Sequence, residues 1–250
     1  MRYRLAIAAL FGLSLPLTAT PTSAEDLKVF SSTALKGVLA EVGPQYQKET
    51  GNTLVFTIGP AAVMKAQIDQ GAAFDVAILT PPLMDGLASA GKVDAATRAV
   101  IARSPLALSA RAGAPKPDVA TVDALKHALL NAKSIGYNGQ GASRAGVEAL
   151  FAKLGIAEDL KPKIKLLTVA APQAVADGEV ELGFSPASEA LEVSGAQLAG
   201  IVPSDYQSYL VLTGAVSAAS QHADAAKALI KSLTGPAVLP VLKKKGMEPG

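Results

Sequence analysis

The chain has 250 residues, of which 50% are apolar, no cysteine, and a formal net charge of +2. This length allows one large domain or two small lobes with a packed core. The charge balance argues against nucleic-acid binding, which demands a strongly basic face, and the absence of cysteine excludes disulfides as a source of stability.

The first 24 residues have the order of a secretory signal peptide. Arg2 and Arg4 supply a positive start, residues 5–17 form an apolar run, and residues 22–24 form a small-residue cleavage site. The apolar run is shorter than the ~20 residues of a membrane-spanning helix, and Pro16 interrupts it. We therefore predict that the mature chain begins at Glu25 and works in the periplasm.

Beyond the signal peptide, short apolar segments alternate with segments of helical spacing. The predicted strands are residues 27–31, 53–58, 75–79, 104–110, 134–137, 164–167, 181–185, 197–201 and 209–216. The predicted helices are residues 33–48, 61–70, 83–90, 122–130, 143–154, 173–177, a helix from 187, 224–233 and 236–245.

This alternation predicts βαβ units and parallel sheets. Because the strands are too many for one small sheet, we predict an α/β protein of two lobes, each a mostly parallel sheet flanked by helices. Residues 25–104 and 208–250 are assigned to lobe 1, and residues 105–207 to lobe 2. The strands at 104–110 and 209–216 are expected to cross between the lobes.

Three strand-to-helix junctions are rich in small and hydroxylic residues: residues 31–34 (SSTA), 59–62 (GPAA) and 138–146 (NGQGASRAG). Ligands of such folds lie where the carboxyl ends of strands face helix N-termini, whose N–H groups and dipole favour anions. The predicted ligand-binding residues are Ser31, Ser32, Thr33, Gly59, Ala61, Thr80, Ser143 and Arg144. Helix capping and simple turn formation are the structural alternatives at these positions.

The chain resembles the periplasmic molybdate-binding proteins, the substrate-binding components of ATP-driven importers. The resemblance is carried by VFSSTALKGVLAEVGPQYQKETG (residues 29–51), by Gln67-Ile68, Gly71 and Asp75-Val76, and by the KLG stretch at residues 153–155. It covers essentially the whole mature chain. It implies the type II periplasmic binding fold, a small anionic ligand and importer membrane subunits as partners.

The ligand residues of that family are only partly present. The serine of the first loop is replaced by Ala34, the serine run of the second loop reads Gly59-Pro60-Ala61-Ala62, and a tyrosine of the second lobe falls on Pro186. Each hydroxyl donor to a charged acceptor is worth ~1.5–3 kcal/mol, so their loss predicts that molybdate is not the favoured ligand.

Arg144 suggests what replaces molybdate. A planar guanidinium grips a carboxylate through two parallel hydrogen bonds, and Arg144 lies in the third anion-facing junction. We therefore expect an organic carboxylate; the alternatives for Arg144 are a solvated surface arginine or a salt bridge to Glu148. His127 and His222 lie in separate predicted helices without acidic or cysteine neighbours at ligand spacing, so no metal site is expected.

Three functions are compatible with these observations. The first is a monomeric periplasmic solute-binding protein without cofactor. The second is an enzyme on the same scaffold, because periplasmic aconitate isomerases, which move a proton on a tricarboxylate, resemble this family. Such an enzyme needs a base near its substrate; Glu189, Lys65 and Tyr137 are candidates, but no catalytic residue is assigned and the binding protein is favoured. The third is a sensor that presents its ligand state to a receptor.

Overall fold

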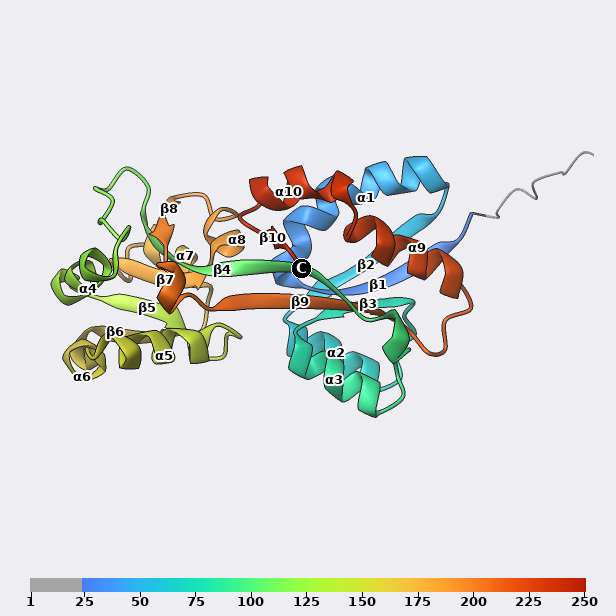
Figure 1. Cartoon of the computed structure of the whole chain (residues 1–250), viewed down its shortest axis with the longest axis horizontal. Coiled ribbons are helices and arrows are strands. Elements are labelled where there is room, and N and C mark those ends of the chain that lie inside the picture. Colours follow the sequence, from blue (N-terminus) through green and yellow to red (C-terminus); the bar gives the residue numbers. More distant parts are fainter. Residues whose placement is uncertain (1–23) are drawn as a thin grey trace, which may run out of the picture.

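The computed structural model describes residues 24–250, so the predicted signal peptide lies, up to residue 23, outside the described residues. The remaining chain forms two sheets, each covered by helices, that are joined by a long strand running between them (Figure 1).

The first sheet and its helices come from both ends of the chain. Its elements are β1 (Asp26–Ser32), η1 (Thr33–Leu35), α1 (Lys36–Thr50), β2 (Thr53–Gly59), α2 (Ala61–Asp69), β3 (Val76–Leu79), α3 (Pro81–Ser89), η2 (Ala95–Thr97), β4 (Ala99–Arg111), β9 (Tyr209–Val216), α9 (Ala223–Leu233), η5 (Pro236–Val238), α10 (Leu239–Lys244) and β10 (Glu248–Pro249). The strand order is β2-β1-β3-β9-β4, with β10 also paired to β4.

The second sheet is formed by the middle of the chain together with the end of β4. Its elements are α4 (Val122–Asn131), β5 (Ile135–Asn138), α5 (Arg144–Leu154), α6 (Ala157–Leu160), η3 (Lys161–Lys163), β6 (Ile164–Leu167), α7 (Ala171–Ala176), β7 (Leu182–Pro186), α8 (Ala187–Ala190), β8 (Ala196–Ile201) and η4 (Ser204–Tyr206). The strand order is β4-β7-β5-β6, with β8 also paired to β4.

Both sheets are mixed. β1 runs parallel to β2 and β3, and β5 runs parallel to β6 and β7, as the βαβ pattern predicts. The pairs that involve β4 and β9 are antiparallel, because β9 returns beside β4 after the chain has passed through the second sheet. Parallel pairs therefore lie at the outer ends of the molecule and antiparallel pairs where the two sheets meet.

One strand crosses between the sheets. β4 pairs with β9 as far as Pro105 and with β7 from Leu106 onward. The prediction that residues 209–216 also cross between the sheets is wrong, because β9 pairs only with β3 and the first half of β4. The return connection is the segment 202–208, where the Leu106 amide donates to the Ser208 carbonyl at 2.9 Å. We propose the lobe boundaries at these two places.

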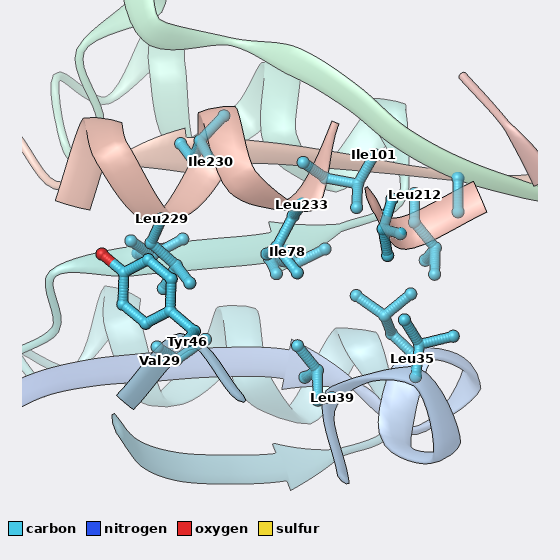
Figure 2. Packing of buried hydrophobic residues seen from close by; sticks show 14 of the residues in the cluster. Val29, Leu35, Leu39, Tyr46, Ile78, Ile101, Leu212, Leu229, Ile230 and Leu233 are labelled. Atoms are coloured by element: carbon cyan, nitrogen blue, oxygen red, sulfur yellow. The ribbon is translucent and has the colours of Figure 1, made fainter. Parts of the chain in front are cut away.

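Separate hydrophobic cores support the two sheets. In the first, α1 and α9 bury Leu39, Tyr46 and Leu229 against the sheet (Figure 2), and α2 and α3 bury Met64 and Met84 on its other face. Each such side chain contributes ~1.5–3 kcal/mol on burial. The second sheet has its own core, in which Leu108, Phe151 and Phe184 are buried. In the described part of the chain, no single helix is long and apolar enough to span a membrane; the bent pair Ala223–Leu233 and Pro236–Lys244 passes only by length and composition.

Candidate functional site

The carboxyl ends of the parallel strands meet at the junction of the two sheets. In the first sheet Ser32 lies opposite Gly59, and Ser31 lies opposite Ile78, which places Thr80 at the same edge. In the second sheet β5 and β7 are parallel neighbours, so the 139–143 loop and α8 share an edge. The two edges approach each other, because η1 packs against α8. Six predicted first-lobe positions therefore lie at or next to the edge that faces the second lobe.

A small cavity lies where the two sheets meet. It has a volume of about 60 Å³ and is lined by Ser104, Leu106, Ala142, Ser143, Gly146, Pro186, Ser208, Tyr209 and Leu210. Four of these residues carry hydroxyl groups, which suit an anionic oxygen without bringing a charge. A complete small-molecule site is larger, at ~300 Å³ or more, so this cavity accommodates only part of a ligand.

Of the eight predicted binding residues, Ser143 alone lines this cavity. Its side chain makes no capping hydrogen bond to α5, and Thr80 makes none to α3, so the capping alternative does not account for either hydroxyl. Ser32 does cap η1, with its Oγ accepting from the Ala34 amide at 3.4 Å. Ser31 is fully buried and donates to the Ser32 carbonyl.

The three remaining first-lobe candidates, Thr33, Gly59 and Ala61, have different surroundings. Thr33 is exposed at the start of η1. Gly59 ends β2, and a Cβ at this position would lie 2.8 Å from the Met64 side chain. Ala61 begins α2 and packs against the core beneath α2 and α3. None of these three residues lines the cavity.

Arg144 adopts the salt bridge named above as the alternative to ligand binding. Its Nε donates to Glu148 Oε1 at 2.8 Å, and its Nη1 donates to the Gly139 carbonyl at 2.9 Å. Glu148 also accepts from the Tyr137 hydroxyl at 3.4 Å. Burial, with Glu148 as a second cause, raises the pKa of Tyr137. Arg144 therefore ties the 139–144 loop to the first turns of α5, beside Ser143 in the cavity wall.

Helix α8 contains two polar side chains with unusual surroundings. Ser188 is 4% exposed, and its Oγ is the buried side-chain oxygen that has no hydrogen-bond partner among the described residues. Burial raises the pKa of the neighbouring Glu189 from 4.5 to about 7. Neither side chain caps the helix, whose N-cap is Pro186.

The other two candidate bases lie in different surroundings. Lys65 pairs with Asp69 at 2.6 Å along α2, one helical turn away. The Tyr137 hydroxyl is bonded to Glu148. Glu189 has no such partner among residues 24–250 and is the candidate that remains.

Direct contacts hold the two lobes together beside α8. The Ser188 amide donates to Ser104 Oγ at 3.0 Å, and Ser104 Oγ donates to the Gly246 carbonyl at 3.2 Å. On the far side of α8, Lys245 pairs with Glu192 at 3.1 Å. Gly246 has a φ of +66°, and a Cβ there would lie 3.2 Å from the Ala187 carbonyl oxygen, so this approach requires glycine.

Sequence reasoning missed Ser104, Ser188, Ser208 and Tyr209, and did not assign Glu189. Ser104 and Tyr209 lie on strands, Ser208 on a connection and Ser188 on α8, and these elements come together only when the lobes assemble. Glu189 did carry a signal, because no lysine or arginine stands three or four residues from it on either side. In the described residues no three histidine, aspartate or glutamate side chains gather as a metal site.

Residues 27–248 match the family model described as "Bacterial extracellular solute-binding protein". Aconitate isomerase from a Pseudomonas species is 30% identical over 251 residues, which cover 98% of this chain and 95% of that protein. The molybdate-binding protein ModA of Azotobacter vinelandii is 29% identical and covers 92% of each chain.

Among solved structures, the periplasmic molybdate-binding protein of Azotobacter vinelandii superposes with a TM-score of 0.73 at 19% identity, covering 90% of this chain and 99% of that one. This likeness confirms the predicted type II periplasmic binding fold. The family model and the sequence relatives confirm the predicted resemblance to molybdate-binding proteins and imply binding of a small ligand. The chain therefore belongs to the family of bacterial extracellular solute-binding proteins.

Proposed function

We propose that this protein is a periplasmic isomerase that acts on a small tricarboxylate in the cleft between its lobes, as an aconitate isomerase does. The observation that carries the proposal is a cleft that departs from the molybdate-binding pattern at Ala34 and Pro186, in a chain that matches aconitate isomerase along 98% of its length. This function was the alternative in the sequence analysis, and the comparisons support it better than carboxylate import.

The chemistry defines what the cleft must supply. Aconitate is a propene with three carboxylates, and its geometric isomers interconvert when a proton leaves the methylene carbon and returns at the other end of the allyl system. The site must hold the carboxylates and move one proton. The hydroxyls of Ser143 and Ser208 supply neutral donors. Closure of the lobes around the remaining carboxylates is a hinge motion known for such folds.

The test is direct incubation of the purified mature protein with cis- or trans-aconitate, followed by proton NMR. We expect each isomer to be converted into the other until a constant ratio is reached. Propane-1,2,3-tricarboxylate, which lacks the double bond, is the matched ligand that binds without turnover. A ligand at one hundred times its dissociation constant adds about 2.7 kcal/mol of stability, so thermal unfolding reports binding independently of turnover.

Molybdate and tungstate are the comparison ligands. Both are expected to raise the melting temperature less than the tricarboxylates do, because the family's hydroxyl donors are missing. Sub-micromolar molybdate binding without aconitate conversion contradicts the proposal. Capture of a small anion for importer membrane subunits is the second candidate, favoured by the family model; tricarboxylate binding without turnover supports it.

Arg144 is proposed to bind one substrate carboxylate in exchange for Glu148. Arg144→Ala is expected to raise KM about ten- to hundredfold, the effect of losing a hydrogen bond to a charged group. Glu148→Gln is the matched variant: it removes the internal competitor at 2.8 Å and is expected to leave KM unchanged or lower. Steady-state kinetics distinguish the roles, because equal effects of both substitutions indicate that the pair only shapes the 139–144 loop.

A further inference from the structure

Helix α8 lies between the cavity and the first-lobe loop. It follows β7 directly, and Pro186, the last residue of β7, lines the cavity. The Ser188 amide is bonded to Ser104 Oγ, and Ser104 lines the cavity from the first sheet. On its other side α8 packs against η1, which begins at Thr33. Helix α8 therefore lies at the meeting point of both predicted anion-binding edges.

Ser188 has an unsatisfied hydroxyl at this meeting point, and the neighbouring, partly buried Glu189 has no ion pair among the described residues. A buried hydroxyl without a partner costs ~1–3 kcal/mol, and a buried carboxylate without a counter-ion costs more. Ser188 Oγ is buried without a hydrogen bond, and Glu189 is mostly buried without an ion pair among the described residues. Folds retain such groups chiefly where a ligand satisfies them.

The surroundings of Glu189 contain little charge. Among the elements that pack against α8, the sequences of β7, β8, α7 and η1 contain no titratable side chain. β4 contributes Arg103, which pairs with Glu248 at 3.0 Å, and Arg111, which is exposed at the end of the strand. Next to α8, Lys245 is already paired with Glu192. Apart from the exposed Arg111, these elements offer Glu189 no unpaired cation.

We propose that Glu189 removes and returns the substrate proton, with Ser188 Oγ bonded to the same substrate, which rests on the isomerase function proposed above. The Glu189 carboxylate takes a proton from the methylene carbon, and the C–H electron pair spreads over the three allyl carbons. The resulting carboxylic acid then gives its proton to the opposite allyl carbon, which moves the double bond. No oxidant, reductant or second substrate is consumed.

This role requires a carboxyl that can hold a proton near neutral pH. Burial raises the pKa of Glu189 to about 7, which suits a group that both accepts and donates a proton. Because the carboxylate is the form that starts the reaction, kcat/KM is expected to rise with pH up to about 7 and then level off.

The experiment compares wild type, Glu189→Gln, Glu189→Asp and Ser188→Ala in D₂O by proton NMR. Glu189→Gln is expected to lower kcat about 10²- to 10⁴-fold, the usual contribution of general acid–base catalysis. It should also abolish the pH dependence and suppress deuterium incorporation, while KM stays within threefold. Glu189→Asp should recover part of kcat, whereas Ser188→Ala should raise KM. Glu179→Gln, at an exposed glutamate ten residues earlier, is the control expected to match wild type.

The outcomes separate this role from the proposed function. If wild type converts aconitate and Glu189→Gln retains more than a third of kcat, the role of Glu189 is overturned while the isomerase function stands. If wild type converts neither isomer, the isomerase function is overturned and the role of Glu189 with it. Thermal unfolding and propane-1,2,3-tricarboxylate binding by each variant show that the folded cleft is retained, so a loss of kcat is not a loss of fold.

Discussion

At pH 8, the free energy of unfolding of Glu189→Gln is expected to be about 3 kcal/mol higher than that of wild type. The pKa of this carboxyl is raised from 4.5 to about 7 in the folded protein, and each pKa unit corresponds to about 1.36 kcal/mol. For a chain of this size the gain corresponds to a rise in melting temperature of roughly 6–12 °C. Glutamine keeps the shape of the neutral acid and removes the cost of ionising it inside the protein.

The sign of the effect follows from proton binding. Below pH 4.5 the carboxyl is protonated in both states, so the substitution is expected to have little effect. Between pH 4.5 and about 7 the unfolded chain loses the proton while the folded protein keeps it, so wild-type stability falls as pH rises. Above pH 7 the difference is constant.

Thermal and urea unfolding of both proteins from pH 4 to pH 9 measures this difference. Glu179→Gln is again the control, because its side chain is exposed and substitutions of exposed residues usually change stability by less than about 0.5 kcal/mol. A variant that gains stability while losing turnover indicates a group retained for function. A Glu189→Gln protein that is less stable than wild type at pH 8 shows instead that the ionised carboxylate is stabilised in the fold, which contradicts its acid–base role.

Phe184→Ala is expected to destabilise the protein by about 3–5 kcal/mol, the usual cost of removing a buried phenylalanine ring. Phe184 is 1% exposed in β7, and its ring meets Phe151 edge-on with the ring centroids 5.6 Å apart. The substitution removes this ring contact between β7 and α5 and leaves a cavity in the second core. Because β7 leads directly into α8, the same substitution should weaken substrate binding.

Urea unfolding gives the free-energy difference when both proteins show the same dependence of the unfolding free energy on urea concentration. Leu166→Ala is the control on the same sheet, since Leu166 is 55% exposed and exposed substitutions usually change stability by less than about 0.5 kcal/mol. A loss below about 1 kcal/mol for Phe184→Ala shows that the second lobe repacks around the missing ring.

The elements of this fold were largely predictable from local patterns. The strands predicted at residues 164–167 and 209–216 have these bounds in the structure, because alternating or continuous apolar residues depend only on neighbours in the chain. The features that were not predicted include the first five residues of β4, the four-residue helix α6, the two-residue strand β10 and the 3-10 helices η2, η3 and η4. Each is short or has a weak apolar pattern, and β10 exists only because it pairs with β4.

The site was less predictable than the fold. The sequence alone determined the alternation of strands and helices, the family resemblance and the loss of the molybdate donors at Ala34 and Pro186. Only the tertiary structure decided that Arg144 pairs with Glu148 and that Ser104, Ser143 and Ser208 line one cavity.

Glu189 shows the physical reason for this difference. Periodicity and turn chemistry are local, so they can be read from neighbouring residues. The protonation of a carboxyl depends instead on burial, and α8 is covered by η1 and β4, whose residues lie more than seventy positions away in the chain. Burial by such distant segments is a property of the assembled lobes.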